Sequence, residues 1–161
     1  MQANCSGSPP GMAAASCPCL ALPGCAILQF LIDTPAQTIM IGYCMFGTND
    51  LARAATFYDA LLAEMGAKRL MDFGSCIVWG TTMDRPSLGV GKPYDGQAAS
   101  VGNGVMVALM ADSKATVDRM HAKALALGAQ DEGAAGPRSE GFYCGYFRDL
   151  DGNKLNVFFM G

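Results

Sequence analysis

GFYCGYFRDLDGNKLNVFFMG, the sequence of residues 141–161, contains two alternating runs that are rich in aromatic residues. The runs span 142–148 and 154–160, and they flank a short polar segment at 149–153. Aspartate, glycine and asparagine tolerate the tight backbone of a hairpin turn. Successive side chains of a strand point to opposite faces, so each run has one apolar face to bury. The segment therefore predicts a β-hairpin.

The chain from residue 40 onward has the pattern of a strand, a helix and further strands. An alternating run over 40–47 leads to Asn49 or Asp50, and either side chain suits the N-cap of a helix. Apolar residues then recur at helical spacing over 51–65, and Gly66 ends the helix. Three strand-like runs follow, at 69–73, 76–80 and 88–91.

The second half of the chain repeats this order. A strand over 104–110 leads to Asp112 or Ser113 as a helix cap, and Gly128 ends the helix that follows. The extra length of this half falls in 131–139, whose glycines and proline predict a flexible loop that lies over a pocket as a lid. The two halves therefore predict two similar modules.

Two segments carry a resemblance to a known family. Residues 48–58 and 147–153 resemble the vicinal oxygen chelate (VOC) superfamily of glyoxalases, bleomycin-resistance proteins and extradiol dioxygenases. The resemblance covers 40–161 and implies an α+β fold. In that fold two βαβββ modules form a curled mixed sheet around a cavity, with the helices outside. A ferredoxin-like α+β domain is the alternative, and it predicts fewer strands.

Residues 1–39 differ in composition from the rest. They contain no Lys or Arg, and Asp33 is their only acidic residue. Without a basic start they do not form a secretory signal. We expect an N-terminal extension outside the core, followed by a single domain over 40–161 with modules at 40–98 and 101–161.

Composition excludes several classes of function. The chain is 51% hydrophobic and 16% charged, as expected of one globular domain. The net charge of −3 argues against nucleic acid or an anionic membrane as a partner. No apolar run reaches the length of a membrane span. The seven cysteines include no CxxC pair, which favours free thiols in a reducing cytoplasm over a zinc site.

The resemblance implies a divalent metal held by His and Glu on the first and last strands of each module. The matching positions are Tyr43, Gly89, Met106 and Asn156. None of these residues supplies the imidazole or carboxylate that such a metal needs. His121 is the only histidine, and its mid-helix position predicts a packing or surface role. We therefore expect no metal and no other cofactor.

Strand alternation predicts which side chains share the cavity with these positions. Trp79 joins the set because it is as far from Gly89 as Tyr146 is from Asn156, so that the two hairpins superpose. The predicted ligand-binding residues are Tyr43, Met45, Ile77, Trp79, Met106, Cys144, Tyr146, Asn156 and Phe158. A small-molecule pocket and a filled core both fit this list. No residue is assigned a catalytic role, and no neighbouring cation in the pattern activates the Cys144 thiol.

Three functions compete. The first is a metal-free protein that binds a small, partly aromatic or apolar molecule, as bleomycin-resistance proteins sequester theirs. The second is a lyase, isomerase or thiol transferase with Tyr43 or Tyr146 as acid or base. It needs a tyrosine whose pKa a neighbouring cation lowers, and Arg138 or Lys92 of the loops are the candidates for that cation. The third is an interaction module with a filled cavity. Exposed sheet edges and the family resemblance also predict a homodimer.

Overall fold

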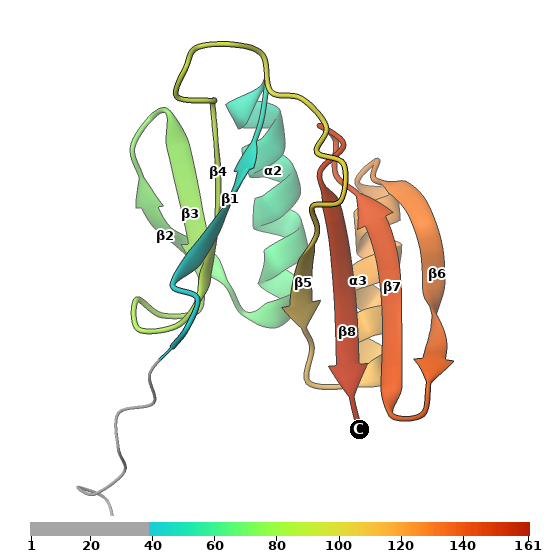
Figure 1. Ribbon diagram of the computed structural model, residues 1–161. Coiled ribbons are helices and arrows are strands. Elements are labelled where there is room, and N and C mark those ends of the chain that lie inside the picture. The colour runs from blue at the N-terminus through green and yellow to red at the C-terminus, as the bar shows by residue number, and fades with distance from the viewer. Residues whose placement is uncertain (1–38) are drawn as a thin grey trace, which may run out of the picture. The chain divides into compact units, whose positions relative to one another are not determined.

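The computed structural model describes residues 39–161, and it contains the same order of elements twice (Figure 1). The prediction for residues 1–39 lies outside the described residues, apart from Ile39. The first module consists of β1 (Tyr43–Gly47), α2 (Leu51–Leu62), a 3₁₀ turn (Ala63–Met65), β2 (Lys68–Asp72), β3 (Cys76–Gly80) and β4 (Ser87–Gly91). The second consists of β5 (Val107–Met110), α3 (Lys114–Ala126), β6 (Gln130–Ser139), β7 (Phe142–Arg148) and β8 (Lys154–Met160).

Each module forms one mixed sheet of four strands. The strand orders are β1-β4-β3-β2 and β5-β8-β7-β6. In each sheet the first strand of the module pairs in parallel with the last, and the remaining pairs are antiparallel. The predicted α+β fold of two βαβββ modules is therefore confirmed, and the ferredoxin-like alternative is wrong.

Both helices begin at the predicted kind of cap. The side chain of Asp50 accepts a hydrogen bond from the backbone N–H of Arg53, and Ser113 caps the second helix through the N–H of Thr116. Each cap satisfies a backbone donor that the first helical turn leaves free. Gly66, at φ +71°, ends the first helical segment in the left-handed conformation that glycine adopts without strain.

The segment 131–139 is a strand, so the prediction of a flexible loop is wrong. It forms most of β6, which pairs with β7 across three register shifts. Pairing needs backbone N–H and C=O groups rather than a regular side-chain pattern, and the bulges absorb the extra residues. Pro137, which has no N–H, is tolerated because β6 lies at the edge of its sheet.

One continuous core joins the two modules. It contains Phe57, Tyr58 and Leu61 of α2 together with residues of α3 and β8 such as Val117 and Leu155, all at most 2% exposed. Figure 1 shows α2 beside the first sheet and α3 behind the second. Each sheet therefore has one face covered by a helix, and no helix of residues 39–161 covers the opposite face.

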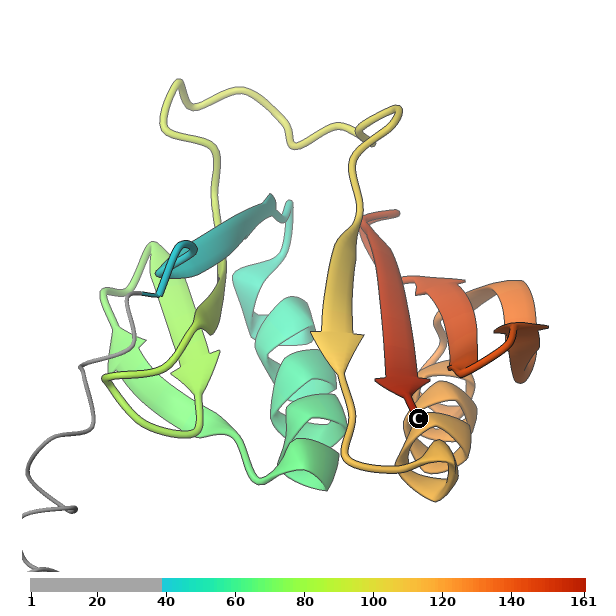
Figure 2. The ribbon, with the colours of Figure 1, turned by 60° about the horizontal axis from the view of Figure 1, so that its bottom comes forward.

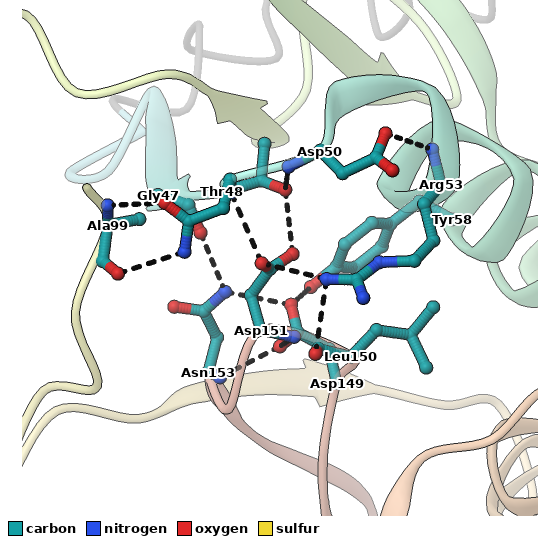
Figure 3. A network of polar contacts seen from close by, with 11 residues as sticks. Gly47, Thr48, Asp50, Arg53, Tyr58, Ala99, Asp149, Leu150, Asp151 and Asn153 are labelled. Carbon is teal, nitrogen blue, oxygen red and sulfur yellow. Dashed lines mark hydrogen bonds and ion pairs between the residues drawn. The ribbon is translucent and has the colours of Figure 1, made fainter. Parts of the chain in front are cut away.

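The turn between β7 and β8 holds the modules together (Figure 3). Asp149, which is buried, accepts hydrogen bonds from the Tyr58 hydroxyl at 2.7 Å, from the backbone N–H groups of Asp151 and Asn153, and from the Asn153 amide. Tyr58 belongs to α2 of the first module. Burial first, and then the Asp149 carboxylate, raise the pKa of Tyr58, so its hydroxyl stays protonated and continues to donate.

The other residues of the turn contact the segment that leads into α2. The carboxylate of Asp151 accepts from the buried Thr48 hydroxyl at 2.6 Å and from Arg53 at 3.1 Å. The Asn153 amide donates to the Gly47 carbonyl at 3.0 Å. Because charge-assisted hydrogen bonds are the stronger kind, this network anchors the second hairpin on the first module.

The linker 92–106 crosses from β4 to β5 and is held at its middle (Figure 2). The side chain of Asn49 binds the backbone of Ala99 twice, accepting from its N–H at 2.8 Å and donating to its carbonyl at 3.0 Å. The linker is therefore fixed to the same short segment, 47–53, that binds the turn.

Replacing Tyr58 by phenylalanine tests the network. Tyr58→Phe removes one donor from a buried carboxylate, so we expect it to lower the free energy of unfolding by about 1–3 kcal/mol. Urea denaturation would show this as a lower midpoint with an unchanged slope. Tyr94→Phe, at a fully exposed tyrosine, is the control and should change neither value. Equal midpoints for the two variants would show that the Tyr58–Asp149 bond contributes nothing.

Candidate functional site

The second hairpin carries most of the candidate site. Tyr143 and Phe147 point towards α3 and the core, where the Tyr143 hydroxyl donates to Asp118 at 2.8 Å. Because side chains alternate along a strand, residues 142, 144 and 146 point to the opposite side, which we call the open face of the second sheet. It carries Phe142, Cys144, Tyr146, Asn156 and Phe158. The face that alternation predicts for this hairpin is the face that the structure shows.

Cross-strand pairing brings these side chains together in rows. Tyr146 lies opposite Asn156, and Cys144 lies opposite Phe158. The rings of Phe142 and Phe158 are 5.6 Å apart between centroids. The Asn156 amide, 2% exposed, donates to the Gly145 carbonyl at 3.2 Å. The open face is therefore aromatic, with a thiol, a phenol and one internally bonded amide among the rings.

The first strands of the two modules contribute exposed residues. In β1, Cys44 and Phe46 pack against the core, whereas Tyr43 and Met45 are 66% and 47% exposed. Met106 is 44% exposed and precedes β5, which begins three residues later than predicted. The predicted lining residues of these strands are thus turned away from the helices, but a single chain does not enclose them.

The first hairpin is reversed relative to the prediction. Trp79 is 1% exposed, and its indole N–H donates to Asp59 of α2 at 2.8 Å. Its ring is 5.6 Å from that of Tyr58. Ile77, two residues earlier, is 4% exposed in the same core. Trp79 and Ile77 therefore face the helix, and the prediction that they line the cavity is wrong.

A longer turn explains the reversal. Gly89 pairs with Val78, whereas the superposition of the two hairpins put Trp79 at that place. The connection between β3 and β4 is one residue longer than the one between β7 and β8. A slip of one residue moves every side chain of a strand to the other face. Val78 and Gly89, and not Ile77 and Trp79, belong to the open side of the first sheet.

The residues at the metal positions of the resemblance do not fit a metal. A Cβ at Gly89 would overlap the sulfur of Met45, so the Met45 side chain occupies that place. Asn156 is bonded to a carbonyl, and Tyr43 and Met106 are poor ligands for zinc or iron. Within residues 39–161 no group of three or more His, Cys, Asp or Glu side chains is placed to hold a metal ion.

Charged residues surround Tyr146, and of these the sequence analysis named only Arg138, as a cation of the expected loop. The guanidinium of Arg138 lies 5.8 Å from the Tyr146 ring centroid, and the Lys154 ammonium lies 5.5 Å from it. Glu132 pairs with Lys154 at 2.9 Å and with Arg148 at 2.5 Å. Alternation from Asn156 would have placed Lys154 here. Arg138 could not be placed, because its segment was predicted to be a loop.

Tyr146 is not activated by these cations. A hydrogen bond with the Cys144 thiol, followed by partial burial, raises the pKa of Tyr146, and the charge of Arg138 opposes this only in part. The phenol therefore stays protonated at neutral pH and is a hydrogen-bond donor rather than a base.

His121 serves packing on the helix side of the second sheet. It is buried, and its Nε2 lies 3.2 Å from an Asp131 carboxylate oxygen and 3.3 Å from the Tyr146 carbonyl. Gly145 leaves room for the ring, because a Cβ there would come within 2.8 Å of it. The histidine is therefore separated from the open face by the sheet itself.

A hollow of about 140 Å³ opens beside Lys154, between β1, β8 and the linker. Its lining includes Met45 from β1, Lys154 from β8, and Ser100 and Val105 from the linker. Lys154 thus contacts both the hollow and the Tyr146 ring.

No helix among residues 39–161 is long and apolar enough to cross a membrane.

Several solved structures similar to this chain are described as glyoxalase-related proteins. A glyoxalase/bleomycin resistance protein from Albidiferax ferrireducens is 30% identical, with a TM-score of 0.70 over 76% of this chain and 100% of that one. A glyoxalase-related enzyme from Fulvimarina pelagi is 20% identical, with a TM-score of 0.60 over 76% and 88%. A lactoylglutathione lyase from Agrobacterium tumefaciens is 23% identical, with a TM-score of 0.54 over 78% and 94%.

Comparisons by sequence alone find no match. No family model matches the chain, and no curated protein matches it significantly.

The emission of the single tryptophan tests the corrected register. Because Trp79 is buried and bonded to Asp59, we expect blue-shifted fluorescence that acrylamide quenches weakly. Trp79→Phe should lower the free energy of unfolding by roughly 1–3 kcal/mol, because it leaves a gap in the core. Quenching as strong as that of free tryptophan would place the indole on the open side and restore the original register.

Proposed function

Because this chain belongs to the VOC superfamily of glyoxalases, bleomycin-resistance proteins and dioxygenases, we propose that it binds a small, partly aromatic molecule without a catalytic metal. The ligand rests on the open face of the second sheet, against the rings of Phe142, Tyr146 and Phe158. Sequestration of that molecule, rather than its conversion, is the proposed role.

The exposure of this face is the observation that carries the proposal. Phe142, Tyr146 and Phe158 are half-buried on a sheet face that no helix of residues 39–161 covers, whereas Phe147 on the helix side is completely buried and Tyr143 and Phe159 there are partly buried. The three partly accessible rings leave aromatic surface against which the ring of a ligand can stack. Aromatic surface with a few polar groups is the usual composition of a small-molecule site, and the phenol of the half-buried Tyr146 supplies one such group.

The chemistry of the site supports binding over catalysis. The metal positions carry Tyr43, Gly89, Met106 and Asn156, which do not form a ligand set for a divalent ion. A tyrosine acid–base mechanism would need a phenol with a lowered pKa, and the pKa of Tyr146 is raised. The residues of this site therefore favour neither metal-assisted catalysis nor acid–base catalysis by tyrosine.

We also propose a homodimer. Tyr43 and Met45 of β1 and Met110 of β5 are large apolar side chains that are 66%, 47% and 70% exposed, on the sides of their sheets that no helix covers. Apolar surface of this kind on a small protein usually marks a contact site. A second copy with two-fold symmetry would cover both sheets at once and enclose the ligand.

The proposed compartment is the cytoplasm. Cys44, Cys76 and Cys144 are free thiols, and no disulfide joins cysteines of the described residues. Free thiols persist in reducing compartments.

A neutral aromatic dye tests ligand binding. Phenylnaphthylamine, whose fluorescence rises in apolar sites, should bind the full chain, and Phe158→Ala should weaken that binding by about 1 kcal/mol, or roughly fivefold. Phe73→Ala, at an exposed phenylalanine between β2 and β3, is the matched control and should have no effect. A dye that does not bind, or that binds both variants equally, would contradict a site on the open face.

The same protein, purified without chelator, separates binding from metal catalysis. We expect elemental analysis to find far less than one transition metal ion per chain. A tightly held, stoichiometric ion would contradict the proposal, since some other residues would then have to ligate it.

Light scattering at micromolar concentration tests the dimer. We expect twice the mass of one chain, and Met110→Asp should shift the protein towards the monomer because it puts a charge on the apolar contact surface. Met83→Asp is the control, because Met83 is equally exposed but lies in the turn after β3. A monodisperse monomer in the wild type would contradict the proposal.

A further inference from the structure

Positive charge gathers at one end of the open face. Arg138, Arg148 and Lys154 lie around Tyr146, and Glu132 is the only carboxylate that pairs with any of them within residues 39–161. Glu132 neutralises one charge, so this end of the face carries an excess of about two positive charges, whereas the chain as a whole carries −3. Charge that opposes the sign of the whole chain is concentrated beside the aromatic rings.

Arg138 is held in place without a carboxylate partner. Its guanidinium folds back along β6, where Nη2 donates to the Ala134 carbonyl at 2.7 Å and Nη1 to the Pro137 carbonyl at 3.4 Å. Gly133 and Gly136 make room for it, since a Cβ at either would lie only 3.4 or 3.3 Å from its nitrogens. A guanidinium has five N–H donors, so several remain free after these two bonds.

Other cations of the protein differ from Arg138 because they pair with carboxylates. Arg148 and Lys154 share Glu132, and Arg53 and Arg69 pair with Asp151 and Asp59. Arg138 is instead positioned by carbonyl oxygens over the face of an aromatic ring. Carbonyl groups orient a guanidinium but do not neutralise it, and an arginine so held is suited to bind an anion from solution.

We infer that the site takes a ligand with one anionic oxygen group at the end of an aromatic or apolar body, and that Arg138 binds the anionic group. This inference rests on the proposed function and names the chemical class of its ligand. Tyr146 presents its ring beneath the cation and its phenol beside it. The body of the ligand lies along the strands towards the ring pair of Phe142 and Phe158.

The length of the face limits the size of the ligand. Tyr146 and Phe142 are four residues apart on β7, which corresponds to roughly 13 Å along a strand. An anionic group at Arg138 and an apolar body of one or two rings would span this distance. Molecules of the size of naphthalene with a single acidic substituent fit, whereas a free inorganic anion would leave the rings uncovered.

Two dyes that differ in charge test the inference on the full chain. Anilinonaphthalene sulfonate carries an anionic group on nearly the same ring system as neutral phenylnaphthylamine. Arg138→Gln should weaken binding of the sulfonate about tenfold, because it removes a charge-assisted hydrogen bond, and it should leave the neutral dye unaffected. Added salt should likewise weaken only the sulfonate.

Two further variants make the result specific. Arg85→Gln removes an exposed arginine from the turn between β3 and β4, and it should change neither affinity. Phe158→Ala should weaken both dyes, because both rest on the rings. Equal losses of both dyes in Arg138→Gln would show that Arg138 only supports the bulged strand, and would overturn the inference.

The failure of this inference differs from the failure of the proposed function. If the neutral dye binds and the sulfonate binds equally well to wild type and Arg138→Gln, the site exists but does not select anions. If neither dye binds the wild-type chain, the proposed function fails and the inference fails with it.

Discussion

The carboxylate of Asp149 is the group on which the arrangement of the two modules depends. It belongs to the turn of the last hairpin, yet it is buried and accepts a hydrogen bond from Tyr58 of the first module. A buried carboxylate is stable only if donors surround it, and here both modules supply them. With Asp151 bound to Thr48 and Arg53, the network places the second sheet relative to α2 (Figure 3). One face of each sheet then packs on the common core, and no helix of residues 39–161 covers the other face.

The free faces of the two modules differ although the modules share a topology. In the first, the paired residues are the buried Val78 and Gly89, and the Met45 sulfur occupies the place that a side chain would take at Gly89. In the second, Tyr146 and Asn156 occupy the matching pair. The module with the bulky aromatic face is also the one with the long, bulged β6, which brings Arg138 over the rings. The same topology therefore carries small residues at this pair in the first module and large polar or aromatic residues in the second.

The chemistry of the family does not follow from its fold in this chain. The metal-binding strands of the superfamily are present, but their donor positions carry residues that do not ligate zinc or iron, and Asn156 is bonded within its own sheet. What remains is a surface of rings, a protonated phenol and unneutralised positive charge. In the proposed function those groups bind and orient a molecule.

The sequence by itself determined the elements, their order and which side chains of the second hairpin share a face. Caps such as Asp50 and Ser113, stops such as Gly66 and the alternation over 142–160 are local signals, because each depends on the backbone of a few residues. Alternation was enough to assign Cys144, Tyr146, Asn156 and Phe158 to one face, since a short turn fixes the register of that hairpin.

Only the tertiary structure decided the register of the first hairpin, the strand character of 131–139 and the position of Arg138. The turn between β3 and β4 is longer by one residue, which puts Ile77 and Trp79 on the helix side of the sheet. The equal spacing of Trp79 to Gly89 and Tyr146 to Asn156 in the sequence gives no sign of this difference. A strand with Gly133, Gly136 and Pro137 forms because β7 supplies its hydrogen-bond partners, which no local propensity records. The place of a side chain on such a strand follows from the bulges of the pairing, and these exist only once the sheet has formed.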